Sequence, residues 1–430
     1  MASALAAPPA LAQWPQWGGP SRNFTVDATG LAETWPENGP PRLWHRELGD
    51  GYSSVVVDDG MLFTLYRKEP AAAEEYVIAL CAETGKTVWE YKYAAPVREQ
   101  DVQHPGPHST PLVIGDRLFA VGRNALLHCF EKKTGKLLWK QDLAAEFGAG
   151  VPNWGYASSP IAYENSVIVA INRLPEQPQQ NGEGHESGDS RAENDESPVP
   201  YALVALGQDR GDTLWKIRGF DIGHSSPALL KIQGQHHLVL LAHGEAIGVD
   251  PADGKLLWQH AFSQNQGYVM TPILIGEDTL LCSAFEGSHA LKLTEKDGKI
   301  MPEELWYDRK AILGQSTPVQ SGDLVLGSRD GRVAFVVAID VHTGKRLWID
   351  RNFNWTTFLN LGDKLLLLDE EGRLALATPT ADGLTIHTEY EIPEWRTYTC
   401  PTLAGTTLYL RDRRQIMALD LGARALARSD

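Results

Sequence analysis

The sequence Thr134-Gly135-Lys136-Leu137-Leu138-Trp139 follows an apolar run and reads as a tight turn and a strand that contains tryptophan. Variants of this phrase recur with a period of roughly 40–50 residues, which is the spacing of propeller blades. The units are rich in Val, Ile, Leu and Thr and lack 3.6-residue periodicity, which disfavours a helical repeat. We expect one structural role, packing between neighbouring blades, for the tryptophans of the phrase: Trp44, Trp89, Trp139, Trp215, Trp258, Trp306 and Trp348.

A second phrase places hydroxyl-bearing residues directly before a proline near the start of most units. Examples are His108-Ser109-Thr110-Pro111 and His224-Ser225-Ser226-Pro227. Proline cannot donate a hydrogen bond to a strand ladder, so it belongs at the start of a strand or at a sheet edge. The phrase therefore predicts the beginning of the innermost strand of each blade.

Together the two phrases predict an all-β fold, an eight-bladed β-propeller with four-stranded blades. The predicted blades are roughly 52–93, 108–143, 156–219, 224–262, 269–309, 315–351, 358–394, and 398–422 together with 42–48. The last unit has no tryptophan strand, whereas residues 42–48 form such a strand without a unit of their own. We expect the N-terminal strand to complete the last blade, because this removes an exposed edge and closes the ring.

The domain organisation follows from the repeats. Residues 14–422 are expected to form a single propeller, in which the polar segment at about 175–199 is a flexible insert. Residues 1–13 end in a small-x-small pattern that is typical of a signal-peptide remnant, and a disordered tail is the alternative. A C-terminal tail covers 423–430. We expect an exported protein of the periplasm or cell envelope, without a membrane span, since its apolar runs are too short.

Composition limits the partners. The chain has 430 residues and a formal net charge of −16, whereas nucleic acids and anionic membranes bind clustered Lys and Arg. We therefore expect no nucleic-acid partner, and we expect a monomer. The four cysteines form no adjacent or C-x-x-C pair, so buried small apolar residues are the first interpretation and a disulfide or metal site is the alternative.

A ligand site is expected at the mouth of the central channel, where the innermost strands begin. Aromatic side chains mixed with polar ones suit a protein, a glycan or a small polar ligand, and ordinary channel residues that hold water are the alternative. A histidine pair at 104 and 108 could also bind a metal or act as acid and base. The candidate ligand-binding residues are Tyr52, Asp101, Gln103, His104, His108, Trp154, Tyr156, His224, Tyr268, Gln315, Trp355, Arg396 and Tyr398.

The repeats resemble the pyrroloquinoline-quinone-like β-propeller repeat family, whose blade phrase has the form Ala-Leu-Asp-x-x-Thr-Gly-Lys-x-x-Trp. The stretches 249–258 and 338–348 are close matches, and the resemblance covers about 42–422. The opening 14–20, Trp-Pro-Gln-Trp-Gly-Gly-Pro, is similar to the start of exported bacterial proteins of this type. The family includes quinoprotein alcohol dehydrogenases and non-catalytic scaffolds such as the outer-membrane assembly lipoprotein.

The resemblance implies two classes of function. The enzymes have adjacent cysteines against the cofactor, a tryptophan floor and a calcium ion, and this chain has no adjacent cysteines. The scaffold lipoprotein has an N-terminal lipidated cysteine, and no cysteine precedes Cys81 here. We predict a non-catalytic binding or scaffold propeller without a cofactor or metal. The alternative is a dehydrogenase that uses pyrroloquinoline quinone and calcium, or a carbohydrate-active enzyme, with its site at the channel mouth.

Overall fold

The computed structural model describes residues 13–97, 104–151, 155–171, 201–262, 270–284, 287–313, 316–329, 334–396 and 399–423. The predicted insert at 175–199 lies outside these residues, as do the predicted tails at 1–13 and 423–430 except for one residue each. Within the described part of the chain, no helix has the length and apolar character needed to cross a membrane.

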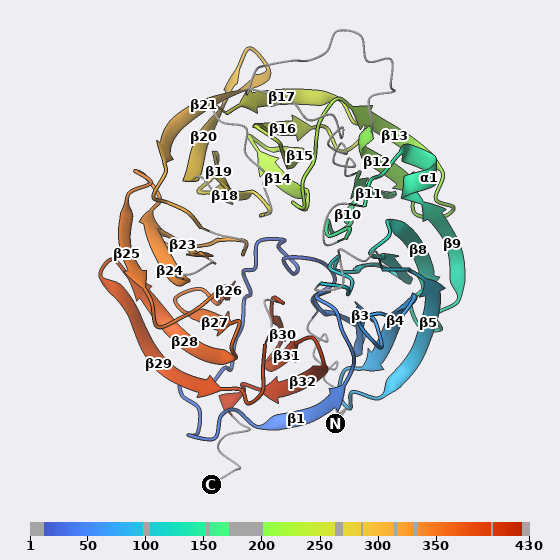
Figure 1. Ribbon diagram of the computed structural model, residues 1–430. Coiled ribbons are helices and arrows are strands. Elements are labelled where there is room, and N and C mark those ends of the chain that lie inside the picture. Colours follow the sequence, from blue (N-terminus) through green and yellow to red (C-terminus); the bar gives the residue numbers. More distant parts are fainter. Residues whose placement is uncertain are drawn as a thin grey trace, which may run out of the picture.

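Four-stranded antiparallel sheets stand around a central axis like the blades of a propeller (Figure 1). In blades 1 to 7 the strands follow one another from the axis outward in sequence order. Blade 1 comprises β2 (Val56–Asp58), β3 (Met61–Tyr66), β4 (Glu74–Cys81) and β5 (Thr87–Ala94). Blade 2 comprises β6 (Leu112–Ile114), β7 (Arg117–Val121), β8 (Leu126–Glu131) and β9 (Leu137–Asp142), followed by the short helix α1 (Leu143–Phe147). Blade 3 comprises β10 (Ile161–Tyr163), β11 (Ser166–Ala170), β12 (Tyr201–Gly207) and β13 (Thr213–Arg218). Blade 4 comprises β14 (Ala228–Ile232), β15 (Gln235–Ala242), β16 (Glu245–Val249) and β17 (Leu256–Ala261).

The second half of the ring repeats this pattern. Blade 5 comprises β18 (Ile273–Ile275), β19 (Thr279–Ala284), β20 (Gly287–Lys296) and β21 (Lys299–Asp308). Blade 6 comprises β22 (Val319–Ser321), β23 (Leu324–Arg329), β24 (Phe335–Asp340) and β25 (Arg346–Asp350). Blade 7 comprises β26 (Thr356–Asn360), β27 (Leu365–Asp369), β28 (Arg373–Thr380) and β29 (Gly383–Glu391). Blade 8 comprises β30 (Thr402–Ala404), β31 (Thr407–Arg411), β32 (Gln415–Asp420) and, as its outermost strand, β1 (Arg42–Glu47).

The N-terminal strand therefore closes the ring. β1 pairs antiparallel with β32, so that the two ends of the propeller are joined within one sheet. The predicted all-β class, the eight four-stranded blades and the closure by the N-terminal strand are confirmed.

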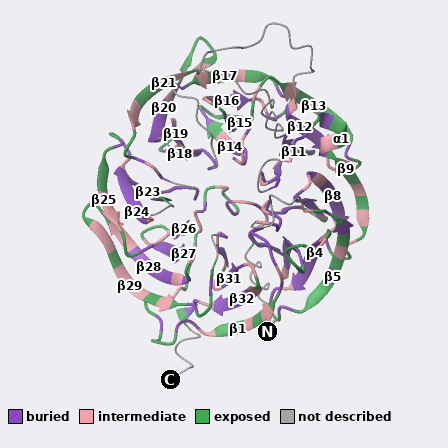
Figure 2. Cartoon of the chain, viewed as in Figure 1, coloured by how far each residue is buried: buried purple, intermediate pink, exposed green. Residues whose placement is uncertain are grey.

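The core lies between the middle strands of neighbouring blades. β11 and β27 are buried along their whole length because another sheet covers each of their faces. The outermost strands β9 and β13 alternate between partly buried and exposed residues, as expected for strands at the rim. Figure 2 shows this gradient from buried inner strands to an exposed rim.

A β-bulge directly before each repeat tryptophan bends the outermost strand. In blade 1, Trp89 lies opposite Ala79 and Thr87 lies opposite Leu80, which leaves Val88 as the extra residue. The same register shift occurs at the equivalent place in the other blades, including the degenerate seventh one. A bulge increases the local twist and re-aims the next side chain. It also disturbs an edge strand that could otherwise pair with another chain.

The re-aimed indole joins two blades. Trp89 Nε1 donates to the Lys132 carbonyl at 2.9 Å, and the ring covers the turn glycine Gly135, where a Cβ would lie 2.5 Å from the indole. The Thr-Gly-Lys turn and the tryptophan are thus two halves of one contact. Other repeat tryptophans also donate to a carbonyl of the next blade: Trp44 to Ala82, Trp139 to Gln208, Trp215 to Pro251 and Trp348 to Thr380.

Trp258 differs from this pattern because the turn glycine of the next blade, Gly298, lies at the end of a longer hairpin and has nothing within 4 Å of its Cβ position. The hairpin of β20 and β21 continues to a pair formed by Lys296 and Lys299, beyond the place where the turn would lie. Trp258 instead covers Gly248 of its own blade and donates to His237 Nδ1 at 3.1 Å.

The segment before β1 runs across the central channel (Figure 1). Its consecutive glycines Gly18 and Gly19 have φ values of 74° and 76°, which other residues rarely adopt, and they allow a compact turn. The segment hydrogen-bonds to innermost strands of several blades: Trp14 to Val57, Pro15 to Val113, Arg22 to Ala162 and Val26 to Asn360. It therefore supplies a fixed floor for one end of the channel.

Candidate functional site

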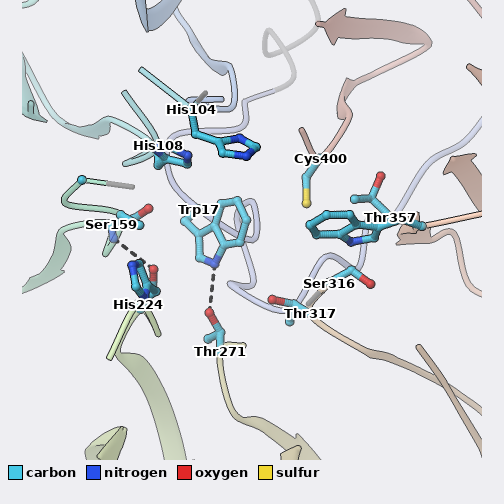
Figure 3. Close-up of a pocket in the computed structure, with 14 residues that line it drawn as sticks. Trp17, His104, His108, Ser159, His224, Thr271, Ser316, Thr317, Thr357 and Cys400 are labelled. Carbon is cyan, nitrogen blue, oxygen red and sulfur yellow. Dashed lines mark hydrogen bonds between the residues drawn. The ribbon is translucent and has the colours of Figure 1, made fainter. Parts of the chain in front are cut away.

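A cavity of about 330 Å³ lies in the central channel, at the end where the innermost strands begin. The N-terminal segment forms its floor with Trp17, and the blades form its walls (Figure 3). Trp17 Nε1 donates to Thr271 Oγ1 at 3.1 Å, and the ring stands edge-on to Phe24 with 5.0 Å between centroids. The floor is thereby fixed to the wall on one side and to its own segment on the other.

Side chains reach the cavity from alternate positions of the strand-start phrase. Extended backbone points every second side chain to the same side, so the residues three and one before the proline both face the channel. The first position supplies His108, Ala157 and His224, and the second supplies Ser159, Ser226, Thr271, Thr317 and Cys400. Ser316, Thr357 and Trp355 complete the wall on the side of blades 6 and 7.

Hydroxyl groups of successive blades are linked around part of this ring. Thr110 Oγ1 accepts the backbone N–H of Ser54 at 3.2 Å, and Ser159 Oγ accepts that of Thr110 at 3.0 Å. Ser226 Oγ in turn accepts the N–H of Ser159 at 3.0 Å. Each hydroxyl uses a lone pair in this contact and keeps its own proton to donate.

The histidines line a different part of the cavity wall, which is aromatic. The rings of His108 and Tyr52 are stacked with 4.6 Å between centroids, and the Tyr52 hydroxyl lies 3.1 Å from His104 Nδ1. Burial lowers the pKa of His108 to about 3, and the charge of Arg123 and the neighbouring His224 add to this effect. Burial also lowers the pKa of His104. The imidazole of His108 is therefore neutral near pH 7.

A buried ionic network positions the histidine loop. Arg67 donates to Glu75 Oε1 at 3.0 Å and to the Pro105 carbonyl at 3.1 Å. Glu75 Oε2 accepts the Tyr93 hydroxyl at 2.8 Å and the Arg123 N–H at 3.0 Å. Arg123 also donates from Nη1 to the carbonyl of His104, which begins the loop, at 2.7 Å. Two loop carbonyls are thus held by guanidinium groups; Glu75 forms an ion pair with the guanidinium of Arg67 and accepts the backbone N–H of Arg123.

The structure brings several of the sequence-predicted residues together. His104, His108, His224 and Trp355 line the cavity, and Tyr52 lies directly behind His108. The remaining candidates that fall outside the described residues are Asp101, Gln103, Trp154, Tyr268, Gln315 and Tyr398.

Two predicted residues lie elsewhere. Tyr156 is fully buried and donates its hydroxyl to the Ala170 carbonyl at 2.8 Å, so it belongs to the core of blade 3. Arg396 is exposed and lines a separate hollow with Glu394, Arg413 and Arg414.

The sequence-based prediction missed the floor and most of the hydroxyl wall. A signal for the wall was present, because the residue directly before each strand-start proline shares its face with the residue two positions earlier. No comparable signal marked Trp17, whose place in the channel depends on how the N-terminal segment folds across the ring.

The described lining residues do not fit calcium or pyrroloquinoline quinone. Calcium prefers carboxylate and carbonyl oxygens, and no Asp or Glu is among the described residues that line the cavity. Across the described ranges, no group of three His, Cys, Asp or Glu side chains has a geometry that could hold a metal ion. The three carboxylates of the quinone call for cationic partners, and the described lining contains no Lys or Arg.

Comparisons with known proteins agree with the fold. A quinoprotein ethanol dehydrogenase of Pseudomonas aeruginosa is 24% identical over 312 residues, which are 60% of this chain and 46% of that protein. The chain thus spans less than half the length of this curated relative. The quinohemoprotein alcohol dehydrogenase of Comamonas testosteroni superposes with a TM-score of 0.67 at 12% identity, over 96% of this chain and 81% of that chain.

The structure of BamB from Moraxella catarrhalis is similar with a TM-score of 0.59 at 14% identity, over 88% of this chain and 97% of that one. The family model described as outer membrane protein assembly factor BamB matches residues 73–350. The predicted membership of the pyrroloquinoline-quinone-like repeat proteins is thereby confirmed. The chain belongs to the β-propeller family that is described as outer membrane protein assembly factor BamB.

Proposed function

We propose that the chain is a non-catalytic binding propeller of the bacterial cell envelope, which holds a small polar ligand in the channel cavity above Trp17. The cavity itself is the observation that supports this function. Ligand pockets have volumes of about 300–1,000 Å³ and a few converging polar groups, and this cavity of about 330 Å³ is lined by hydroxyls, imidazoles and indoles. Its size suits a small molecule and leaves no room for a folded protein segment.

Protein contacts are proposed for the outer rim. The bulged residue before the tryptophan is apolar and about half exposed in several blades, as in Leu43, Val88, Leu214 and Leu305. The printed description of the family, an outer membrane protein assembly factor, favours an envelope location and a protein partner. For this chain, the envelope location and the protein partner at the rim are both proposals.

A second candidate is a quinoprotein dehydrogenase or another enzyme with its site at the channel mouth. The indole floor of the cavity and the ethanol dehydrogenase relative favour it. The lining residues count against it, because they supply neither a carboxylate for calcium nor a cation for the quinone. A general base would also be needed, and His108 is a weak one because burial lowers its pKa to about 3.

One titration separates the two candidates. The purified protein and its Trp17→Leu variant are titrated with pyrroloquinoline quinone plus calcium, and then with glucose, acetate and lactate, by calorimetry. Dye-coupled oxidation of ethanol is measured in parallel. We expect a polar ligand to bind with loss of affinity in Trp17→Leu, and no turnover. Quinone-dependent turnover would refute the non-catalytic function, and the absence of any Trp17-dependent binding would refute the channel as the site.

A further inference from the structure

The surface that the cavity offers to a ligand is mainly aromatic. The rings of Trp17, Trp355, His104 and His224 line the cavity and are partly exposed. Pockets for small molecules are usually lined by aromatic and apolar side chains, with a few polar groups that fix the orientation of the ligand. An aromatic ring gains affinity from the face or edge of another ring beyond what burial alone supplies. The cavity therefore suits a ligand that carries a ring.

The indole of Trp17 is held in place before any ligand arrives. Its Nε1–H donates to Thr271 Oγ1 at 3.1 Å, and its ring stands edge-on to Phe24 with 5.0 Å between centroids. A side chain that is already fixed loses little conformational entropy when a ligand packs against it. In Figure 3, His108 and Cys400 lie on opposite sides of this indole. A ring bound over Trp17 would thus lie between walls from different blades.

The hydroxyl groups of the wall can satisfy only a small polar part of a ligand. Ser159, Ser226 and Thr271 are at most 7% exposed, and the oxygen of each already accepts an N–H group. Each hydroxyl keeps its own proton to donate. A polyol would also place several of its hydroxyls against aromatic rings, where hydrogen bonds to water are lost without replacement. One hydrogen-bonding group on the ligand fits this wall better than many.

The wall also disfavours a charged ligand. The described lining side chains include no Asp, Glu, Lys or Arg. Burial lowers the pKa of His104 and that of His108, so both imidazoles are neutral near pH 7. A carboxylate or an ammonium group would lose its hydration in the cavity and gain no opposite charge in return. A neutral ligand avoids this cost.

We propose that the channel cavity binds a small uncharged aromatic compound that carries one hydrogen-bonding group. The ring of the compound lies over the Trp17 indole, and its polar group meets the hydroxyl wall formed by Ser159, Ser226 and Thr271. This arrangement uses the aromatic surface of the cavity and leaves no charge without a partner. The inference rests on the proposed function and names its ligand class.

The experiment uses three compounds of nearly equal shape that differ in charge. At pH 7 benzamide is neutral, benzoate is an anion and benzylamine is a cation. Each is titrated into the full chain by calorimetry, beside cyclohexanecarboxamide and glucose as neutral probes without an aromatic ring. Trp17→Phe and Trp17→Leu form a matched pair of variants, because both remove the hydrogen bond to Thr271 but only Trp17→Phe keeps an aromatic ring.

We expect benzamide to bind about tenfold or more tightly than benzoate and benzylamine, and more tightly than cyclohexanecarboxamide and glucose. Trp17→Leu should bind benzamide roughly two- to tenfold more weakly than Trp17→Phe. Equal or tighter binding of a charged compound, of cyclohexanecarboxamide or of glucose would overturn the ligand class, and Trp17-dependent binding of that probe would leave the channel as the site.

Equal affinity of the two variants for benzamide would also overturn the contact between the rings. If none of the compounds binds, the inference and the proposed function fall together. Thermal unfolding shows whether both variants are folded, so a misfolded variant is not interpreted as a loss of binding.

Discussion

Replacement of Glu75 by Gln is expected to destabilise the propeller by about 3–5 kcal/mol, the usual cost of removing one partner from a buried ion pair. Both Glu75 and Arg67 have side chains with 0% exposure, so water cannot screen the guanidinium that the substitution leaves behind. The amide also cannot accept from Arg67, Tyr93 and the Arg123 N–H as the carboxylate does. Arg67 and Arg123 hold carbonyls of the histidine loop, so ligand affinity should fall as well.

A surface pair supplies the matched control. The Lys92 and Glu74 side chains are 59% and 43% exposed, so Glu74→Gln should cost only about 0–1 kcal/mol. Urea unfolding at pH 7, followed by tryptophan fluorescence, measures both free energies of unfolding. The double variant Arg67→Met/Glu75→Gln should recover part of the loss, because the orphaned charge is gone.

The ionic interpretation has a clear point of failure. Burial raises the pKa of Glu75, while Arg67 and the hydrogen bonds to Glu75 oppose this rise. If Glu75→Gln costs less than about 1 kcal/mol, Glu75 is protonated in the folded protein and does not neutralise Arg67. A double variant that is worse than the sum of the single ones would also contradict the network.

Three further predictions concern the turns, the histidine wall and the thiols. Gly135→Ala should be more destabilising by roughly 1–3 kcal/mol than Gly115→Ala, since both have positive φ but only Gly135 has an indole where the Cβ would lie; equal losses in urea unfolding would contradict the turn contact. Burial lowers the pKa of His108 to about 3, so the folded protein keeps this imidazole neutral at pH values where the unfolded chain protonates it. The free energy of unfolding should therefore be unaffected by His108 above about pH 6.5 and should fall by at most about 2 kcal/mol between there and pH 5. His108→Gln should reduce this fall, and an unchanged pH profile of stability would contradict the lowered pKa. Cys81 and Cys400 are both partly exposed, so their thiol pKa values should decide which reacts first. Hydrogen bonds from Thr84 and Glu83 lower the pKa of Cys81, whereas desolvation raises that of Cys400 to about 12, so iodoacetamide at pH 8 should modify Cys81 first, as read by mass spectrometry; equal rates would contradict the raised pKa of Cys400.

Much of the fold could be predicted because one contact repeats. The tryptophan and the Thr-Gly-Lys turn are halves of the same inter-blade junction, so their joint spacing reveals the blades and the incomplete last unit reveals the closure by β1. Trp258 does not follow this pattern, because the hairpin of the next blade is longer and turns farther out, which the phrase that contains Trp258 does not reveal.

The site was predictable only in part. His108 and His224 could be placed at the channel from their distance to a proline, since extended backbone alternates its side chains. Tyr156 occupies a comparable place in the sequence, yet its hydroxyl turns into blade 3 and reaches the Ala170 carbonyl.

The sequence by itself determined the all-β class, the blade count and the order of the strands. Alternating burial and turn residues are local properties of the chain, and the same pattern is repeated in each blade. Only the tertiary structure decided the cavity. Its floor, Trp17, and the Thr271 hydroxyl that fixes it are 254 residues apart in the chain, and blades on opposite sides of the ring supply its walls. The physical reason is that a channel exists only after the ring has closed, and residues distant in sequence then face one another across the axis.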